Sequence, residues 1–353
     1  MSRFFNEKYR SLEAYTPGEQ PQDKKYIKLN TNESPYPPSQ GVLNSLNKNE
    51  IENLRLYCDP ECTVLKNTIA KQYGVKSENV FLSNGSDDIL NFSFMAFGGN
   101  GVAYCDITYG FYSVFAQLHG LESEIISLND DFTIDTDKFI GKNKLIVIAN
   151  PNAPTGIALS LTEIEKIVKS NTDSVVLIDE AYVDFGGESC CKLTEKYDNL
   201  LCVGTFSKSR SMAGARLGFA FADKKIIDDL EKIKYSTNPY NINRLTQVAG
   251  TVALQENSYY EDNCKKIIET RDYVTSELEK IGFTVLPSKA NFLFAKSDKI
   301  DGKQLYEKLK EKGVLVRHFD KNKIRDYNRI TIGSRSEMEI FISKVNEIIG
   351  ESL

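Results

Sequence analysis

The hydrophobic pattern between residues 80 and 222 consists of short apolar runs separated by longer amphipathic or turn-rich stretches. Each run is bounded by turn-forming residues, which predicts a buried β-strand. The stretch SLTEIEKIVKS at 160–170 opens with a capping-box signature and predicts a helix. Strands that alternate with helices are typical of a mostly parallel sheet covered by helices, so we predict an α/β fold. The predicted strands cover residues 79–83, 101–105, 144–149, 174–178, 200–205 and 217–222.

The pattern changes on both sides of this region and predicts a second, smaller domain. A long charged helix is expected at 259–280, followed by short apolar runs and turns as far as 334 and a closing helix at 336–349. This arrangement is typical of a small α+β domain. The predicted boundaries give an N-terminal arm with part of the small domain at 1–45, a large domain at 46–255 and a small C-terminal domain at 256–353.

Composition narrows the classes of function and location. The net charge is −5 and no basic block is present, so no nucleic-acid partner is expected. The chain has no apolar run long enough to span a bilayer and no signal-like segment at its start, so we expect a cytoplasmic protein without a membrane partner. The seven cysteines are irregularly spaced, and Cys58 and Cys62 have no further ligands nearby, so neither a disulfide framework nor a metal site is expected.

The stretch TFSKSRSMAGARLGFAF at 205–221 carries the first candidate chemistry. Lys208 lies among hydroxyl-bearing and small residues between two predicted strands, which is unusual for a lysine that serves only as surface charge. Ser207, Ser209 and Arg216 can bind a phosphate group, because hydroxyls and a guanidinium donate to anionic oxygens. A partly desolvated lysine beside a cationic ring has a lowered pKa and becomes a usable amine nucleophile.

Other polar residues follow the predicted strands directly. Asp179 ends the run at 174–178, and NPNAPTG at 150–156 places Asn152 after another strand. Gly85, Ser86 and Asp87 lie where a helix would present free amides to a phosphate. Asp179 alone is most simply a helix cap. Together with Asn152 and Lys208, it indicates a ligand crevice at the carboxyl edge of the sheet.

The pattern S-K-x(7)-R-x-G, formed by Ser207, Lys208, Arg216 and Gly218, resembles the cofactor-lysine signature of fold-type I, pyridoxal 5′-phosphate (PLP)-dependent aminotransferases of class I/II. The NPNAPTG and Gly-Ser-Asp stretches match further motifs of that family, and the likeness runs from about Tyr15 to the C-terminal helix. It implies the PLP transferase fold, with a mostly parallel sheet in a large PLP-binding domain and a smaller α+β domain.

The resemblance also implies roles for individual residues. Lys208 would bind the cofactor covalently and move the substrate proton, while Asp179 would pair with the pyridine nitrogen; these two are the expected catalytic residues. Tyr109 would stack on the ring, although Ile107 replaces the family's usual proline before it. Tyr57 would reach the phosphate in the other subunit of a homodimer, although Cys58-Asp59-Pro60 departs from the family pattern there. The expected cofactor-binding residues are Gly85, Ser86, Asp87, Tyr109, Asn152, Asp179, Tyr182, Thr205, Ser207, Lys208, Arg216 and Tyr57.

Within this family, the Tyr15-Thr16-Pro17-Gly18 arm and the NESPY loop resemble those of histidinol-phosphate aminotransferases. Tyr15, Asn32, Arg317 and Arg329 would contact the substrate. The implied partners are a small-molecule amino donor and a 2-oxo acid. The implied reaction moves an amino group between glutamate and imidazole-acetol phosphate in histidine biosynthesis. An aromatic amino acid aminotransferase and a phosphothreonine decarboxylase remain alternatives on the same scaffold. Two others are a non-catalytic PLP-binding protein, against which the intact Lys208 argues, and a PLP-independent α/β protein with chance motifs.

Overall fold

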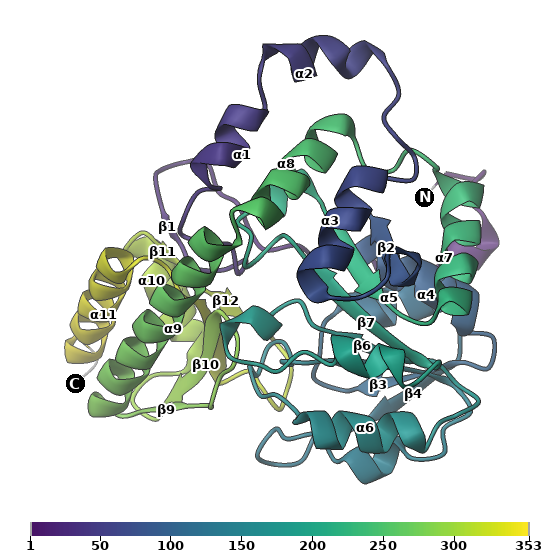
Figure 1. The fold of residues 1–353 in the computed structure, drawn as a ribbon. Coiled ribbons are helices and arrows are strands. Elements are labelled where there is room, and N and C mark those ends of the chain that lie inside the picture. Colours follow the sequence, from purple (N-terminus) through teal and green to yellow (C-terminus); the bar gives the residue numbers. More distant parts are fainter. Residues whose placement is uncertain (1, 352–353) are drawn as a thin grey trace.

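The computed structural model describes residues 2–351, which form a large and a small α/β body (Figure 1). The large body is built on a seven-stranded sheet with the strand order β2-β8-β7-β6-β5-β3-β4. Strand β8 runs antiparallel to β2 and β7, and the other neighbouring pairs are parallel. The strands are β2 (Val80–Ser83), β3 (Val102–Cys105), β4 (Ser123–Ile126), β5 (Leu145–Ala149), β6 (Val176–Asp179), β7 (Leu200–Thr205) and β8 (Gly218–Phe221).

Helices cover both faces of this sheet, which explains why its strands are almost continuously apolar. In β5, Leu145 and Val147 pack with helices α4 (Ser86–Phe97), α5 (Phe111–His119) and α7 (Lys224–Thr237). Ile146 and Ile148 of the same strand belong to the opposite core. That core includes residues of α3 (Thr63–Tyr73), α6 (Leu161–Lys169) and α8 (Arg244–Gln255). Successive side chains along a strand therefore pack into two separate hydrophobic layers, one on each face of the sheet.

The small body contains an antiparallel sheet in the order β12-β13-β10-β9 and a parallel pair, β1 with β11. Two helices, α10 (Gly302–Glu311) and α11 (Arg335–Gly350), pack together against this body. The strands are β1 (Ile27–Lys28), β9 (Phe283–Val285), β10 (Phe292–Ser297), β11 (Val314–Leu315), β12 (Arg317–His318) and β13 (Tyr327–Thr331).

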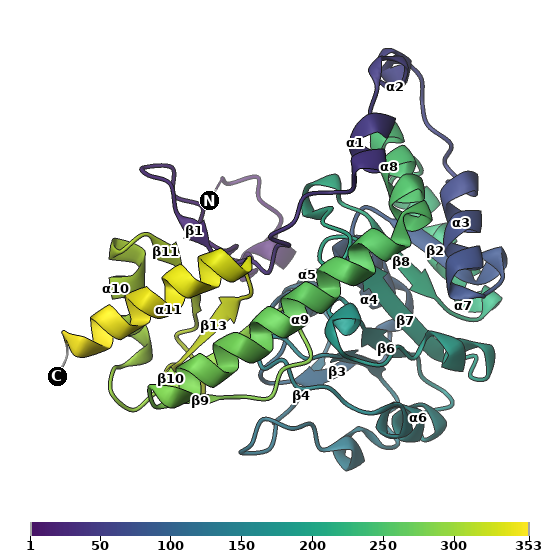
Figure 2. The same ribbon diagram turned by 60° about the vertical axis from the view of Figure 1, so that its left-hand side comes forward.

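The long helix α9 (Asn257–Lys280) connects the two bodies (Figure 2). Its Tyr260 belongs to the large core, whereas Ile267 and Val274 belong to the small one. The N-terminal segment also crosses between them, because β1 pairs in the small body and α1 (Gln40–Ser45) packs against α8. Beyond α1 lies the short helix α2 (Lys48–Glu52).

The mostly parallel sheet with a smaller α+β body confirms the predicted fold class. The three domain boundaries stay predictions. Strand β4 and helix α10 were not predicted; β4 is a short edge strand with only Ile126 fully buried, so its apolar signal is weak. Within residues 2–351, none of the helices combines the length and the apolar character that crossing a membrane requires.

Candidate active site

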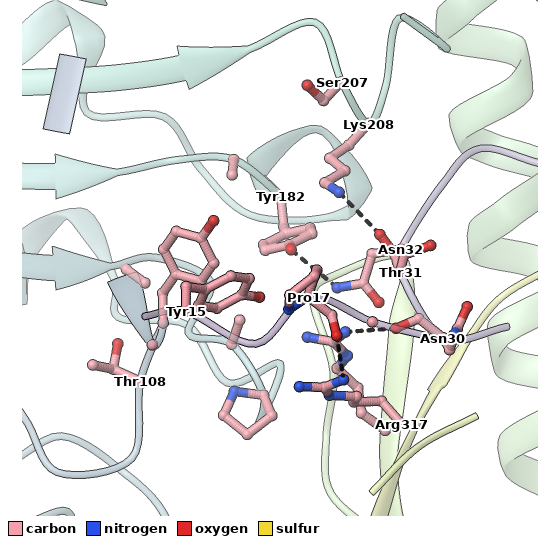
Figure 3. Close-up of a pocket in the computed structure, with 18 of the residues that line it drawn as sticks. Tyr15, Pro17, Asn30, Thr31, Asn32, Thr108, Tyr182, Ser207, Lys208 and Arg317 are labelled. Carbon is pink, nitrogen blue, oxygen red and sulfur yellow. Dashed lines mark hydrogen bonds between the residues drawn. The ribbon is translucent and has the colours of Figure 1, made fainter. Parts of the chain in front are cut away.

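A cavity of about 450 Å³ lies between the carboxyl edge of the large sheet, the N-terminal arm and the small body (Figure 3). Parallel strands end at the same edge, so the loops after β2, β3, β6 and β7 meet there. Strand β8 runs in the opposite direction, so it begins at the edge where the parallel strands end. Arg216, which precedes β8, therefore lies at the same edge. The predicted residues that line the cavity are Tyr15, Asn32, Ser86, Asp87, Tyr109, Asp179, Tyr182, Thr205, Ser207, Lys208, Arg216, Arg317 and Arg329.

Lys208 extends into this cavity from the turn after β7 (Figure 3). Its Nζ donates a hydrogen bond to the Thr31 carbonyl oxygen at 3.2 Å and lies over the Tyr182 ring. Burial lowers the pKa of Lys208 to about 8, and the positive charge of Arg329 acts in the same direction. The amine is therefore partly unprotonated near neutral pH, as a nucleophile or a proton carrier requires.

Asp179 ends β6 and is 5% exposed. Its Oδ2 accepts from Tyr112 Oη at 2.9 Å, and its Oδ1 accepts from the Ala181 amide at 3.2 Å. Burial raises the pKa of Asp179 to about 6, while these hydrogen bonds oppose the rise. The carboxyl group is therefore ionised at neutral pH in spite of its burial and is suited to a cationic partner.

The start of α4 forms a cradle with the properties of an anion site. Gly85, at φ +80°, precedes the helix, and no side chain caps its first amides. A Cβ atom on Gly85 would lie 2.5 Å from Arg216 Nη2, and one on Gly218 would clash with the backbone of Gly85 and Ser86. The two glycines thus allow a guanidinium and free amides to approach one point.

Side chains around this cradle hold one another in place. Arg216 Nη2 pairs with Asp87 Oδ2 at 2.9 Å, and Tyr109 Oη donates to the other oxygen of Asp87 at 2.9 Å. The hydroxyls of Thr205 and Ser207 lie 3.0 Å apart. The carboxylate of Asp87 therefore orients Arg216 and Tyr109, and Arg216 and the helix amides next to it can donate to an anion.

The opposite wall carries two arginines. Arg317 donates to the carbonyl oxygens of Thr16 and Pro17 at 3.1 and 3.2 Å. Arg329 donates to the carbonyl oxygen of Asn30 at 3.0 Å, and its buried Nε has no hydrogen-bond partner among the described residues. In that part of the chain, neither guanidinium has a carboxylate within ion-pair distance. Two cations satisfied only by neutral oxygens form a site for an anionic ligand.

Four residues from the sequence analysis do not reach the lining. Gly85 lies directly behind it. Asn152 is buried beside the cavity, where its side-chain amide bonds the Ile107 carbonyl, Thr155 and Thr108 and so holds the loop.

Ser209 does not clamp a phosphate, because its hydroxyl turns away to Asp184. Tyr57 is 81% exposed and stacks on Tyr240 with 4.5 Å between ring centroids, so it lies outside the cavity of its own chain.

Several residues of the site were missed by the sequence analysis. Thr31 and Asn30 contribute carbonyl oxygens, a role that no side-chain motif can reveal. Tyr112 is a further residue of this kind, because its hydroxyl donates to Asp179. The available signal was its position three residues after Tyr109, in the first turn of α5.

One cluster of potential metal ligands lies behind the site. Glu180, Cys190 and Cys202 are buried with their ligand atoms within 4.8 Å of one another. The Glu180 carboxylate already accepts from the Ser189 hydroxyl and the Cys190 amide. The pKa of Cys190 is raised to about 12, with burial and the nearby carboxylate among the causes that raise it, so the thiol stays protonated. Hydrogen bonds within the protein thus satisfy the Glu180 carboxylate, and we assign no metal to this cluster.

Comparison with known proteins agrees with this geometry. The chain is 51% identical over 352 residues to the histidinol-phosphate aminotransferase of Brachyspira hyodysenteriae, with 99% of both chains covered. It is 48% identical to that of Clostridium acetobutylicum, over 99% of this chain and 100% of the relative. The crystal structure of histidinol-phosphate aminotransferase from Sinorhizobium meliloti in complex with pyridoxal-5′-phosphate has the same fold, with a TM-score of 0.89 at 20% identity, and covers 100% of this chain and 99% of that one. The model of the family "Aminotransferase class I and II" matches residues 24–345, and the chain therefore belongs to this family.

Proposed function

We propose that this chain is a PLP-dependent aminotransferase that exchanges an amino group between histidinol phosphate and 2-oxoglutarate. The observation that carries the proposal is that the Lys208 amine, with its pKa of about 8, shares one cavity with the Asp179 carboxylate and two arginines. Neither arginine has an acidic partner within residues 2–351. The full-length identity to histidinol-phosphate aminotransferases supports the choice of substrate. On this basis the protein acts in histidine biosynthesis.

The residues present fit PLP on structural grounds. The free amides at the start of α4 and the guanidinium of Arg216 suit the phosphate, and the glycines there leave the space it requires. The buried Asp179 suits a protonated ring nitrogen, and Tyr109 offers an aromatic face. We assign the ring oxygen to Tyr182 and Asn152; Asn152 would exchange its hydrogen bond to the Thr155 hydroxyl for one to the cofactor. When bound, the cofactor supplies an electron-withdrawing ring that stabilises negative charge on the substrate carbon.

The protein's own groups then divide the work. Lys208 Nζ would hold the cofactor through its aldehyde carbon and, when free, would move the proton between the substrate carbon and the cofactor carbon. Asp179 stays ionised and favours a protonated ring nitrogen. The hydroxyls of Thr205 and Ser207 lie beside the phosphate cradle. Tyr15 lines the cavity, and its ring stacks on Phe111 at 4.2 Å between centroids.

Arg317 and Arg329 are proposed to bind the substrate's anionic group. A guanidinium gains when it exchanges a backbone carbonyl for a phosphate or carboxylate, because it can then form a bidentate pair with a group of opposite charge. Asn32, whose amide donates to Tyr182 Oη at 3.0 Å, lies between these arginines and Lys208 and is proposed to orient the substrate.

A homodimer with shared active sites completes the proposal. Tyr57 is exposed in the single chain and lies in a segment with exposed Leu54, Leu56 and Val64. Such an apolar surface is typical of an interface. In the dimer, the Tyr57 hydroxyl would reach the phosphate cradle of the other copy. A cytoplasmic location is proposed with it.

A single-turnover titration tests the substrate. Purified protein is loaded with PLP, and histidinol phosphate, phenylalanine and phosphothreonine are added in separate experiments while visible absorbance is recorded. Rapid conversion of the bound cofactor to its amino form by histidinol phosphate alone supports the proposal. Preference for phenylalanine would indicate an aromatic aminotransferase, and carbon dioxide release from phosphothreonine would indicate a decarboxylase. A protein that gains no yellow chromophore with PLP contradicts the proposed cofactor.

A further inference from the structure

Tyr112 is a fully buried tyrosine whose hydroxyl group points to the acid at the end of β6. Its exposed fraction is 0%, and its Oη donates to Asp179 Oδ2 at 2.9 Å. A buried phenol requires a hydrogen-bond partner, and a carboxylate is among the strongest acceptors. The other Asp179 oxygen accepts from the Ala181 amide. Each oxygen of this carboxylate is therefore held by one donor of the protein.

The ring of Tyr112 is fixed by three aromatic neighbours. It stacks on Phe94 at 6.5 Å and meets Tyr104 and Tyr109 edge to face at 6.1 and 5.7 Å between centroids. Tyr109 is the residue expected to stack on the cofactor ring, and Asp179 is the acid expected to meet the ring nitrogen. Tyr112 thus contacts both of these groups from behind, in a position that leaves its hydroxyl little freedom.

The surrounding charges make this hydrogen bond important for Asp179. Among the described residues, the ionisable groups that face the carboxyl are Asp87 from α4, Tyr112 from the start of α5, Tyr182 after β6 and Lys208 after β7. Burial and the charge of Asp87 raise the pKa of Asp179, whereas Tyr112, the Ala181 amide and Lys208 lower it. Burial and the adjacent carboxylate raise the pKa of Tyr112 well above its usual value, so it remains a donor.

We infer that Tyr112 is a positioning residue for the cofactor: it holds the Asp179 carboxylate as an oriented anion that faces the ring nitrogen. This inference rests on the proposed function, because the ring nitrogen belongs to PLP. Without the phenol hydroxyl, one oxygen of a buried carboxylate loses its donor, and the neutral acid is favoured over the anion. A neutral acid attracts a protonated ring nitrogen much less.

The test measures the equilibrium affinity of the apo-protein for PLP between pH 5 and 8. Tyr112→Phe keeps the ring and removes only the hydroxyl group. At neutral pH we expect the affinity for PLP to be about tenfold weaker than in the unsubstituted protein, because the substitution removes one charge-assisted hydrogen bond. The pH at which the affinity falls on acidification should rise by about one pH unit, because the carboxyl is protonated more easily.

A carbocyclic analogue of PLP, with C–H in place of the ring nitrogen, separates positioning from a structural effect. Tyr112→Phe should bind this analogue as well as the unsubstituted protein does. The matched control is Tyr104→Phe, which removes a buried hydroxyl bonded to Ser123 at 3.2 Å and should change neither affinity. Equal losses for PLP and the analogue, or no loss for either, would overturn the inference. Failure of the unsubstituted protein to bind PLP would instead contradict the proposed function.

Discussion

The two walls of the cavity satisfy their charged groups in different ways. On the sheet wall, Arg216 pairs with Asp87, and Asp179 accepts from Tyr112, so these charges have side-chain partners from the same body. On the wall formed by the N-terminal arm and the small body, Arg317 and Arg329 donate, within residues 2–351, only to backbone carbonyl oxygens. The first wall is fixed before any ligand arrives, whereas the second keeps two strong donors available.

This difference separates the proposed tasks of the two walls. Side-chain pairs fix the position and ionisation of groups that must meet a resident cofactor, and such preorganisation is the usual requirement for catalysis. Guanidinium groups held by neutral carbonyls retain most of their attraction for an anion and can exchange partners with each substrate. Substitutions on the sheet wall should therefore change cofactor binding, and those on the arginine wall should change substrate binding.

The largest effect is expected from Lys208→Ala on the sheet wall. Loss of both the covalent link and the proton carrier should reduce kcat by about 10⁴-fold or more, measured as aminotransfer from histidinol phosphate. Borohydride reduction followed by peptide mass mapping should label Lys208 in the unsubstituted protein and leave the variant unlabelled. The surface substitution Lys192→Ala is the control. An alanine variant that turns over at the normal rate refutes the central assignment.

The arginine wall is tested by Arg329→Ala and Arg317→Ala. Arg329 is the more enclosed of the two, so its loss should lower kcat/KM by about 100-fold, and that of Arg317 by about tenfold. Neither change should alter the affinity for PLP by more than about twofold, which equilibrium dialysis can measure. A large loss of cofactor affinity in either variant would break the proposed separation of the walls.

The ionisation of Asp179 should be visible in the stability of the apo-protein. Its pKa in the folded chain is about 6, above its usual value, so the folded state binds the proton more readily. The charged carboxyl therefore destabilises the fold above pH 6, and this penalty disappears as the pH falls from 6 to 4. Asp179→Asn should raise the free energy of unfolding by about 2 kcal/mol at pH 8. The gain should be near zero at pH 4 in urea denaturation; a gain that does not depend on pH would contradict the shifted pKa.

The smallest effect is expected from Tyr57→Phe, which tests whether the sheet wall is completed by a second copy. Loss of one hydrogen bond to the phosphate should weaken the affinity for PLP by about five- to tenfold. The control is Tyr235→Phe, which removes another exposed hydroxyl, bonded to Glu61. Sedimentation should show a dimer under the assay conditions. A fully active monomer would contradict the cross-subunit role.

The sequence was most informative where chemistry and local pattern coincide. The predicted strand at 200–205 agrees with β7, so Lys208 was placed correctly in the turn after it. The same holds for Asp179 at the end of β6. Prediction failed for Ser209, whose neighbours suggested a phosphate clamp. Its direction depends on Asp184, a residue 25 positions away, and local pattern cannot show which way one hydroxyl turns.

The sequence by itself determined the alternating strands and helices, the motif residues at the strand ends and the family to which they point. These features depend on periodicity and spacing within a few residues, which the linear chain records directly. Only the tertiary structure decided the partners: Tyr112 with Asp179 across 67 positions, and Arg317 with Thr16 across 301. Such contacts depend on the strand order, the packing of α5 on the sheet and the path of the N-terminal arm. Small differences in packing energy select them, and no single stretch of sequence contains that information.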